Sequence, residues 1–246
     1  MLAKRILVVT YIAVFPFDRP SNYDGMLNKI GIFTFLIALA LVYWIATVVP
    51  GIQRKLDFPN LEAEIFWGMH VKFSYAITAA LIALIARVIR LHDKLSDLLR
   101  IRATFDLHRI LIPLAGAVDY PVGLSLRDKL MINRKDAMQR LFYSYASFEE
   151  PKIPKALVLA AIESWTWYWI LLEGSFLVSI AAIIFLISRH LDAASIALSI
   201  CIVCFGLFAT CFSVCGRKAD FQISEIAIDE NSRSEIRKRL ADMQNS

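Results

Sequence analysis

The chain has 246 residues, of which 58% are hydrophobic, and a formal net charge of +5 at pH 7. Its mean hydropathy is +0.56. Ordinary soluble domains contain only about 45–50% apolar residues, so this composition excludes a typical soluble protein and indicates an integral membrane protein.

The N-terminal segment resembles a signal peptide, because Lys4 and Arg5 precede an apolar run. Pro16, Asp18 and Arg19 follow this run in place of a small-x-small cleavage site. The run is also too short to cross a bilayer, and it is rich in β-branched residues. We therefore predict that residues 1–29 are retained, with their start forming a strand or an interfacial segment.

Four apolar windows are long enough to cross a membrane, which takes about 20 residues per helix. They are residues 30–49, 71–89, 169–187 and 193–215. The predicted fold is an all-α membrane protein with four transmembrane helices. The predicted parts are an N-terminal segment (1–29), helices 1 and 2 (30–90), a basic helical cytoplasmic domain (91–155), helices 3 and 4 (156–215) and a cytoplasmic tail (216–246).

The distribution of Lys and Arg predicts the orientation, since cytoplasmic segments of membrane proteins are enriched in both. Residues 87–155 hold thirteen of the 27 Lys and Arg residues, whereas the turn at 188–192 holds only Arg189. We expect both termini and residues 87–155 on the cytoplasmic side of a cell inner (plasma) membrane. All four cysteines lie in the fourth window, which predicts no disulfide framework.

The second helix has no Gly or Pro between Met69 and Pro113. A helix of that length extends well beyond a hydrocarbon core of about 30 Å, so its second half is predicted to be a cytoplasmic stalk continuous with the span. Leu91, Leu95, Leu98 and Leu99 form an apolar stripe on this stalk. The stripe predicts a partner, either within the chain or in a neighbouring subunit of a symmetric homo-oligomer.

Further along, residues 113–124 are predicted to be a loop. Capping-box pairs begin two helices, Ser125 with Asp128 and Asn133 with Asp136. The three tryptophans of residues 164–169 predict an aromatic belt at the membrane interface. Residues 217–230 fit either a strand or a helix, and an amphipathic helix is predicted to end the chain.

Basic side chains of the stalk and of the cytoplasmic domain are candidates for binding an anionic ligand. They are Arg87, Arg90, Lys94, Arg100, Arg102, Arg109, Arg127, Arg134 and Lys135. In an oligomer such a cluster repeats around an axis and attracts a polyanion. The alternative is that these charges only set the membrane orientation and contact anionic lipid headgroups.

Glu173 is an ionisable residue inside a predicted span, and such residues usually face the bundle interior or a water path. It either lines a pore or pairs with a basic residue near the interface. The remaining candidates for pore lining or helix packing are Ser175, Ser179, Cys201, Cys204, Cys211 and Cys215. A metal site at the cysteines is disfavoured, because one face of one helix cannot surround a tetrahedral ion; close packing of small residues is the simpler interpretation.

Catalytic motifs are missing from the sequence: it has no HExxH, P-loop, GxSxG or Gly-rich dinucleotide loop. The histidines at positions 70, 92, 108 and 190 are scattered, and we interpret His92 and His108 as surface or interface residues. We expect no enzyme activity, no cofactor and no bound metal.

In span number and basic cytoplasmic segment, the chain resembles the small four-span effectors of bacterial anti-phage systems. That resemblance rests on no motif and assigns no residue a role. It implies a channel or membrane-permeabilising effector that answers a nucleotide or oligonucleotide made by a separate enzyme. The expected function is thus an oligomeric channel controlled by an anionic cytoplasmic ligand. The alternative is a membrane anchor or scaffold whose stalk binds a partner protein; a lipid-modifying enzyme or a transporter is disfavoured by the missing motifs and repeats.

Overall fold

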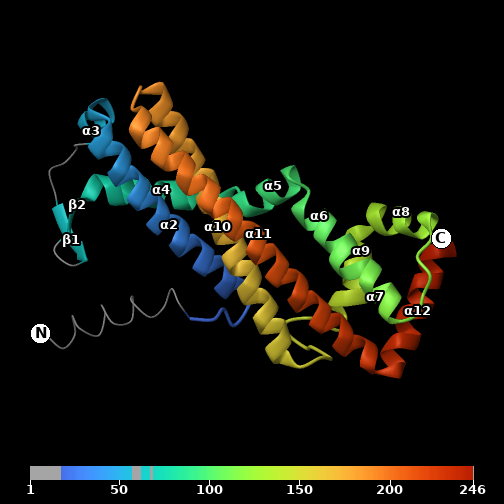
Figure 1. Ribbon diagram of the computed structural model, residues 1–246. Coiled ribbons are helices and arrows are strands. Elements are labelled where there is room, and N and C mark those ends of the chain that lie inside the picture. The colour runs from blue at the N-terminus through green and yellow to red at the C-terminus, as the bar shows by residue number, and fades with distance from the viewer. Residues whose placement is uncertain (1–17, 57–61, 67–68, 246) are drawn as a thin grey trace, which may run out of the picture. The chain divides into compact units, whose positions relative to one another are not determined.

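The computed structural model describes residues 18–56, 62–66 and 69–245, and these residues are almost entirely helical (Figure 1). The predicted helical fold class is therefore confirmed. The prediction for the first seventeen residues lies outside the described part of the chain. Within the described part of the chain, three helices are long and apolar enough to cross a membrane: α2 (Tyr23–Val48), α10 (Lys155–Ile187) and α11 (Leu191–Ile228).

Shorter elements lie between and after these three helices. They are α3 (Pro50–Leu56), β1 (Glu62–Phe66), β2 (Met69–Lys72), α4 (Phe73–Val88), α5 (Leu91–Leu98), α6 (Ile101–Phe105), the π-helix η2 (Asp106–Leu111), α7 (Ile112–Ala117), α8 (Leu124–Ile132), α9 (Arg134–Ala137), the π-helix η3 (Met138–Tyr143) and α12 (Glu230–Asn245).

The second predicted helix is broken, and this corrects the expectation of a stalk that continues the span without interruption. Arg90 adopts a left-handed backbone conformation with φ of 53°, and α4 and α5 meet there at an angle of 56°. Only as a bent pair do they reach the length of a fourth span. A second left-handed residue, Arg100, precedes α6. We call the α4–α5 bend the elbow.

A small antiparallel ladder joins β1 to β2 just before α4. Glu62 pairs with Lys72 and Ala63 with Val71, and the register shifts between Glu64 and Phe66. The sequence contains no clear alternation that announces this ladder. Lys72 then starts α4 from an extended conformation, with φ of −62° and ψ of 133°.

The chain divides into two compact units. Unit 1 includes residues 24–94 and 166–210, and unit 2 includes residues 95–165 and 211–246. The core of unit 1 is rich in alanine, contributed by α2, α4, α10 and α11: Ala38, Ala79, Ala181, Ala182, Ala193, Ala194 and Ala197. Small side chains let helices approach closely, which favours packing in lipid, where burial of apolar surface drives association only weakly.

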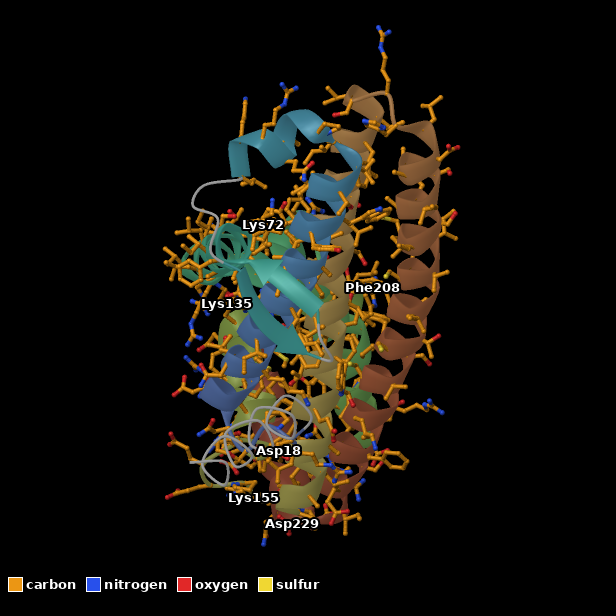
Figure 2. All side chains as sticks on the ribbon, turned by 90° about the vertical axis from the view of Figure 1, so that its left-hand side faces the viewer. Asp18, Lys72, Lys135, Lys155, Phe208 and Asp229 are labelled. Atoms are coloured by element: carbon orange, nitrogen blue, oxygen red, sulfur yellow. The ribbon has the colours of Figure 1, made fainter. Side chains whose placement is uncertain are left out.

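The two long helices α10 and α11 are joined by a turn in which Arg189 has φ of 62°, as the sequence predicts for residues 188–192. Phe208 of α11, labelled in Figure 2, stacks on Tyr168 of α10 with ring centroids 4.2 Å apart. Tyr168 and Trp169 are both buried. The predicted aromatic belt is therefore wrong for these two residues, which serve in helix packing.

Unit 2 is a cluster of short helices, and two local predictions fail in it. Residues 113–124 are not all loop, because α7 continues η2 as far as Ala117 and α8 begins at Leu124. Neither capping box forms: Gly123 is the N-cap residue of α8, and Asn133 makes no side-chain cap to α9.

Helix α12 completes unit 2, and α11 continues without a break to Ile228, so residues 217–228 are helical. Buried Ile236 and Leu240 form the apolar face of α12. On its polar face, Tyr145 donates a hydrogen bond to Glu235 at 2.7 Å, and Arg237 donates to the carbonyl of Val118 at 2.6 Å. The predicted terminal amphipathic helix is confirmed.

Gly174 offers a test of helix packing in unit 1. A Cβ at this position would lie 3.0 Å from Cδ1 of Ile37 on α2. Gly174→Val should therefore lower the free energy of unfolding by about 1–3 kcal/mol, measured by thermal melting in detergent. Gly116→Val is the matched control, since a Cβ there has no heavy atom within 4 Å; equal effects of both changes would contradict this packing.

Candidate functional site

The most buried polar cluster of unit 1 is centred on Glu173 of α10, which is 3% exposed. Its Oε2 accepts a hydrogen bond from the hydroxyl of Thr34 on α2 at 2.6 Å. Its Oε1 accepts one from the backbone N–H of His92 on α5 at 3.0 Å. The carboxyl group thus connects α2, α5 and α10 inside an otherwise apolar bundle.

The elbow explains why the bundle holds a carboxylate. A new helix begins at Leu91, and the first N–H groups of any helix lack partners within that helix. In apolar surroundings each unsatisfied group costs several kcal/mol. The Glu173 carboxylate accepts the N–H of His92, and a negative charge at a helix N-terminus is further favoured by the helix dipole.

The side chain of His92 also contacts Glu173. Its Nδ1 lies 3.2 Å from Oε1 of Glu173, and its ring packs 6.0 Å from the ring of Trp169. The other ring nitrogen, Nε2, is buried and has no hydrogen-bond partner among the described residues. It faces Oδ1 of Asp93 at 3.7 Å, which is beyond hydrogen-bond range.

Next to this cluster lies a cavity of about 40 Å³, lined by α2, α4, α5 and α10. A buried water needs about 10–15 Å³, so the cavity is large enough for water. The lining residues are Leu27, Ile30, Gly31, Thr34, Ala83, Ala86, Arg87, Arg90, His92 and Glu173. The site is thus a small hollow within the helices of unit 1, mostly apolar in its lining, with Glu173, His92 and Thr34 as polar groups on its wall.

The predicted anion-binding residues are divided between the two units. In unit 1, Arg87 and Arg90 line the cavity; Arg87 donates to Oδ1 of Asn28 at 2.9 Å, and Arg90 pairs with Asp93 at 2.9 Å. Lys94 is exposed.

The others belong to unit 2. Arg100 and Lys135 are exposed, Arg102 is half-buried, and Arg109 lies against Gly216. Arg127 is 3.5 Å from Nε2 of His108.

Arg134 is committed to a structural ion pair with Asp106 of η2. Burial raises the pKa of Asp106 to about 6, although the charges of Arg134 and Arg102 act to lower it. The loss of hydration therefore raises the pKa of this carboxyl by more than the ion pair with Arg134 lowers it. Arg134 is accordingly a weak candidate for binding a ligand.

The candidate serines and cysteines lie along α10 and α11. The hydroxyl of Ser175 donates to the carbonyl of Leu171 at 2.6 Å, and that of Ser179 donates to Ser175 at 2.8 Å. Sγ of Cys201 is 3.5 Å from Oγ of Ser179. These polar groups are satisfied close to their own helices, an arrangement that suits packing.

Cys204 borders an open hollow on α11, and Cys211 and Cys215 belong to unit 2. Among the residues that the structure describes, no three His, Cys, Asp or Glu side chains gather as a metal site would require.

The sequence analysis identified Glu173 but missed its partners. Glu173 contacts neither lysine nor arginine by any ion pair in the described residues; it is paired with Thr34 and His92. His92 is 4% exposed, so its interpretation as a surface residue is wrong. The partner Thr34 could have been suspected from the sequence, because it places a hydroxyl within the apolar window of the first predicted span.

Replacing Glu173 tests the role of its carboxyl group in the fold. Glu173→Ala leaves the His92 N–H and the Thr34 hydroxyl with fewer buried partners, so the free energy of unfolding should fall by at least about 2 kcal/mol. Glu173→Gln keeps an acceptor for His92 and should cost about 1 kcal/mol or less. Thermal melting in detergent checks both values; an equal loss in the two variants would argue against the cap.

The raised pKa of Asp106 predicts a pH dependence. Between its ordinary value, 3.8, and about 6, the folded state holds a proton that the unfolded state has released. Protonated Asp106 thus adds to the free energy of unfolding below about pH 4. This contribution, roughly 3 kcal/mol in total, is lost as the pH rises through 6. Melting curves against pH should show this slope in the wild type and in Asp136→Asn, whose carboxyl is exposed. Asp106→Asn should lack it.

The chain was compared with known protein families, curated proteins and solved structures. Residues 22–241 match the model of the YmfE protein family, so the chain belongs to this family. No curated protein matches the chain. No solved structure matches it either. The match shows no relation to anti-phage effectors.

Proposed function

We propose that this member of the YmfE protein family conducts ions across a membrane. The observation that carries the proposal is the buried cluster of Glu173, His92 and Thr34 beside a cavity large enough for water. Ionisable groups within membrane helices are costly and commonly mark ion or proton routes. The start of α5 accounts for the carboxylate of Glu173 through the backbone N–H of His92, but it does not require the imidazole that also contacts this carboxylate.

The proposed topology has four spans, with the bent pair α4–α5 as the second. Both termini and residues 99–154 then face the cytoplasm of a cell whose inner membrane holds the protein. The Lys and Arg distribution supports this arrangement, because the turn at residues 188–190 has a single basic residue. The elbow would then lie where the second span approaches the cytoplasmic surface.

A symmetric homo-oligomer is part of the proposal. The cavity beside Glu173 has a volume of about 40 Å³, which is far too small for a route across a membrane by itself. In its most apolar window α11 is just 6% buried, compared with 44% for α10. Four small residues of α11 are exposed and form one stripe along the helix, because they are spaced by about one or two helical turns: Ser195, Ser199, Gly206 and Thr210. Such small residues favour close helix contacts in lipid, so this stripe supports α11 as the subunit interface.

An anionic cytoplasmic ligand is the proposed control. Arg87 and Arg90 support it, because both are exposed at the cavity that holds Glu173. Sites that enclose drug-sized ligands have volumes of about 300–1,000 Å³, so a nucleotide or oligonucleotide would bind outside the cavity, on the guanidinium groups. Binding there would act on the elbow, since Arg90 is the residue at which the chain bends.

The second candidate function is a scaffold that binds a partner protein. It is favoured by exposed apolar side chains in unit 2: Leu98 is 78% exposed, and Leu124 and Ile132 are each 80% exposed. Leu91 and Leu95, in contrast, are buried within the chain. The predicted leucine stripe therefore divides, and only its end, with α8, remains available to a partner.

Ion flux from liposomes tests the first proposal. The wild-type protein should release potassium or chloride faster than empty liposomes do, and nucleotides or short oligonucleotides should change that rate. Arg87→Glu with Arg90→Glu should abolish the response to these anions. The control variant is Arg217→Glu with Lys238→Glu. It changes the net charge by the same amount at residues that do not line the cavity, and it should keep the response to these anions.

No flux under any condition, from protein shown to be folded and inserted, would refute ion conduction. The scaffold would then be the better account. Its own test is the change of Leu98 and Leu99 to Ser, which should abolish capture of a partner while leaving the fold intact.

A further inference from the structure

We infer that Glu173, His92 and Thr34 form a binding site for a proton taken from water in the adjacent cavity. The inference rests on the proposed function, because it names the proton as an ion that occupies the proposed route. It also has a direct test that does not depend on ion flux.

Thr34 shows how the cluster can hold Glu173 in two protonation states. Its Oγ1 lies 2.9 Å from the carbonyl oxygen of Ile30 and 2.6 Å from Oε2 of Glu173. A hydroxyl has one proton and two lone pairs. When Glu173 is ionised, Thr34 donates to Oε2. When Glu173 carries a proton on Oε1, Oε2 becomes the carbonyl oxygen of the acid and still accepts the hydrogen bond from Thr34.

His92 provides the entry. Because Nδ1 lies against Oε1 of Glu173, a proton on Nδ1 leaves Nε2 as the nitrogen that lacks a hydrogen-bond partner among the described residues. His92 is among the residues that line the cavity. Nε2 itself is buried, so entry of a proton requires the ring to turn toward cavity water. An imidazole that meets a carboxylate with one nitrogen and water with the other is the usual arrangement of a proton shuttle.

The transfer balances without any further reagent. A hydronium ion in the cavity gives its proton to Nε2, which forms an N–H bond and leaves water. The Nδ1–H bond then breaks, and the proton bonds to Oε1 of Glu173. The ring returns to neutrality as its other tautomer, and the carboxylate becomes a neutral carboxylic acid. The reverse sequence releases the proton to the cavity.

Charged groups from every neighbouring element bear on this step. From the elbow, Arg90 pairs with Asp93, whose second oxygen faces Nε2 of His92 at 3.7 Å. Arg87, at the end of α4, is held by Asn28 of α2. Lys29 of α2 instead contacts the carbonyl of Asp18 and the ring of Trp167. The guanidinium groups of Arg87 and Arg90 repel a cation in the cavity. The carboxylates of Asp93 and Glu173 attract one, and they face the two ring nitrogens of His92. The charges therefore favour a proton on His92 or Glu173.

Infrared difference spectroscopy against pH tests the inference on the full-length protein in lipid. A carbonyl band of a protonated carboxylic acid should appear and disappear within the pH range that is scanned. Glu173→Gln should remove the band, and Glu163→Gln, which removes a carboxyl outside the cluster on the same helix, should leave it. Thr34→Val should move the band to higher frequency, because the carbonyl oxygen Oε2 loses its hydrogen-bond donor.

The absence of any band assignable to Glu173 in this range would overturn the proton site. Flux provides the second measurement: Glu173→Gln should reduce proton flux on the order of a hundredfold, and unchanged proton flux would overturn the site as well. A titrating Glu173 band in protein that conducts no ion at all would support the site while refuting ion conduction. The two proposals can therefore fail separately.

Discussion

A helix that begins inside an apolar bundle must find acceptors for its first N–H groups, and this constraint organises unit 1. The break at Arg90 creates such a beginning, and Glu173 supplies the acceptor from another helix. Thr34 then has to donate to the second carboxyl oxygen, which draws α2 to the same point. Burying a carboxylate is costly, but leaving the start of α5 unpaired in the same surroundings would also cost several kcal/mol.

Composition and hydropathy were sufficient to predict the helical membrane class, because the apolar windows of α2, α10 and α11 far exceed what a soluble core needs. The elbow was beyond such reasoning. Arg90 and Arg100 carry side chains that ordinarily avoid the left-handed conformation, so no residue type announces the breaks. The absence of Gly and Pro predicted a continuous helix, whereas the start of α5 after the bend uses a carboxyl group 81 residues later in the chain.

Hydropathy also made part of the candidate site predictable. A glutamate in an apolar window stands out, and Glu173 was identified from that alone. Its partners are a threonine and a histidine that look ordinary in the sequence, and only the packing of three helices brings them together. The arginines are prominent in the sequence, but most of them are not part of the site. Arg134 forms an ion pair with Asp106, and of the predicted arginines only Arg87 and Arg90 line the cavity.

The elbow has a consequence for biogenesis. Synthesis runs from the N-terminus, so α2, α4 and α5 are made before α10. The backbone N–H of residue 92 therefore lacks its acceptor until residue 173 has been added to the chain. A chain that ends before α10 would leave the start of α5 without this hydrogen bond.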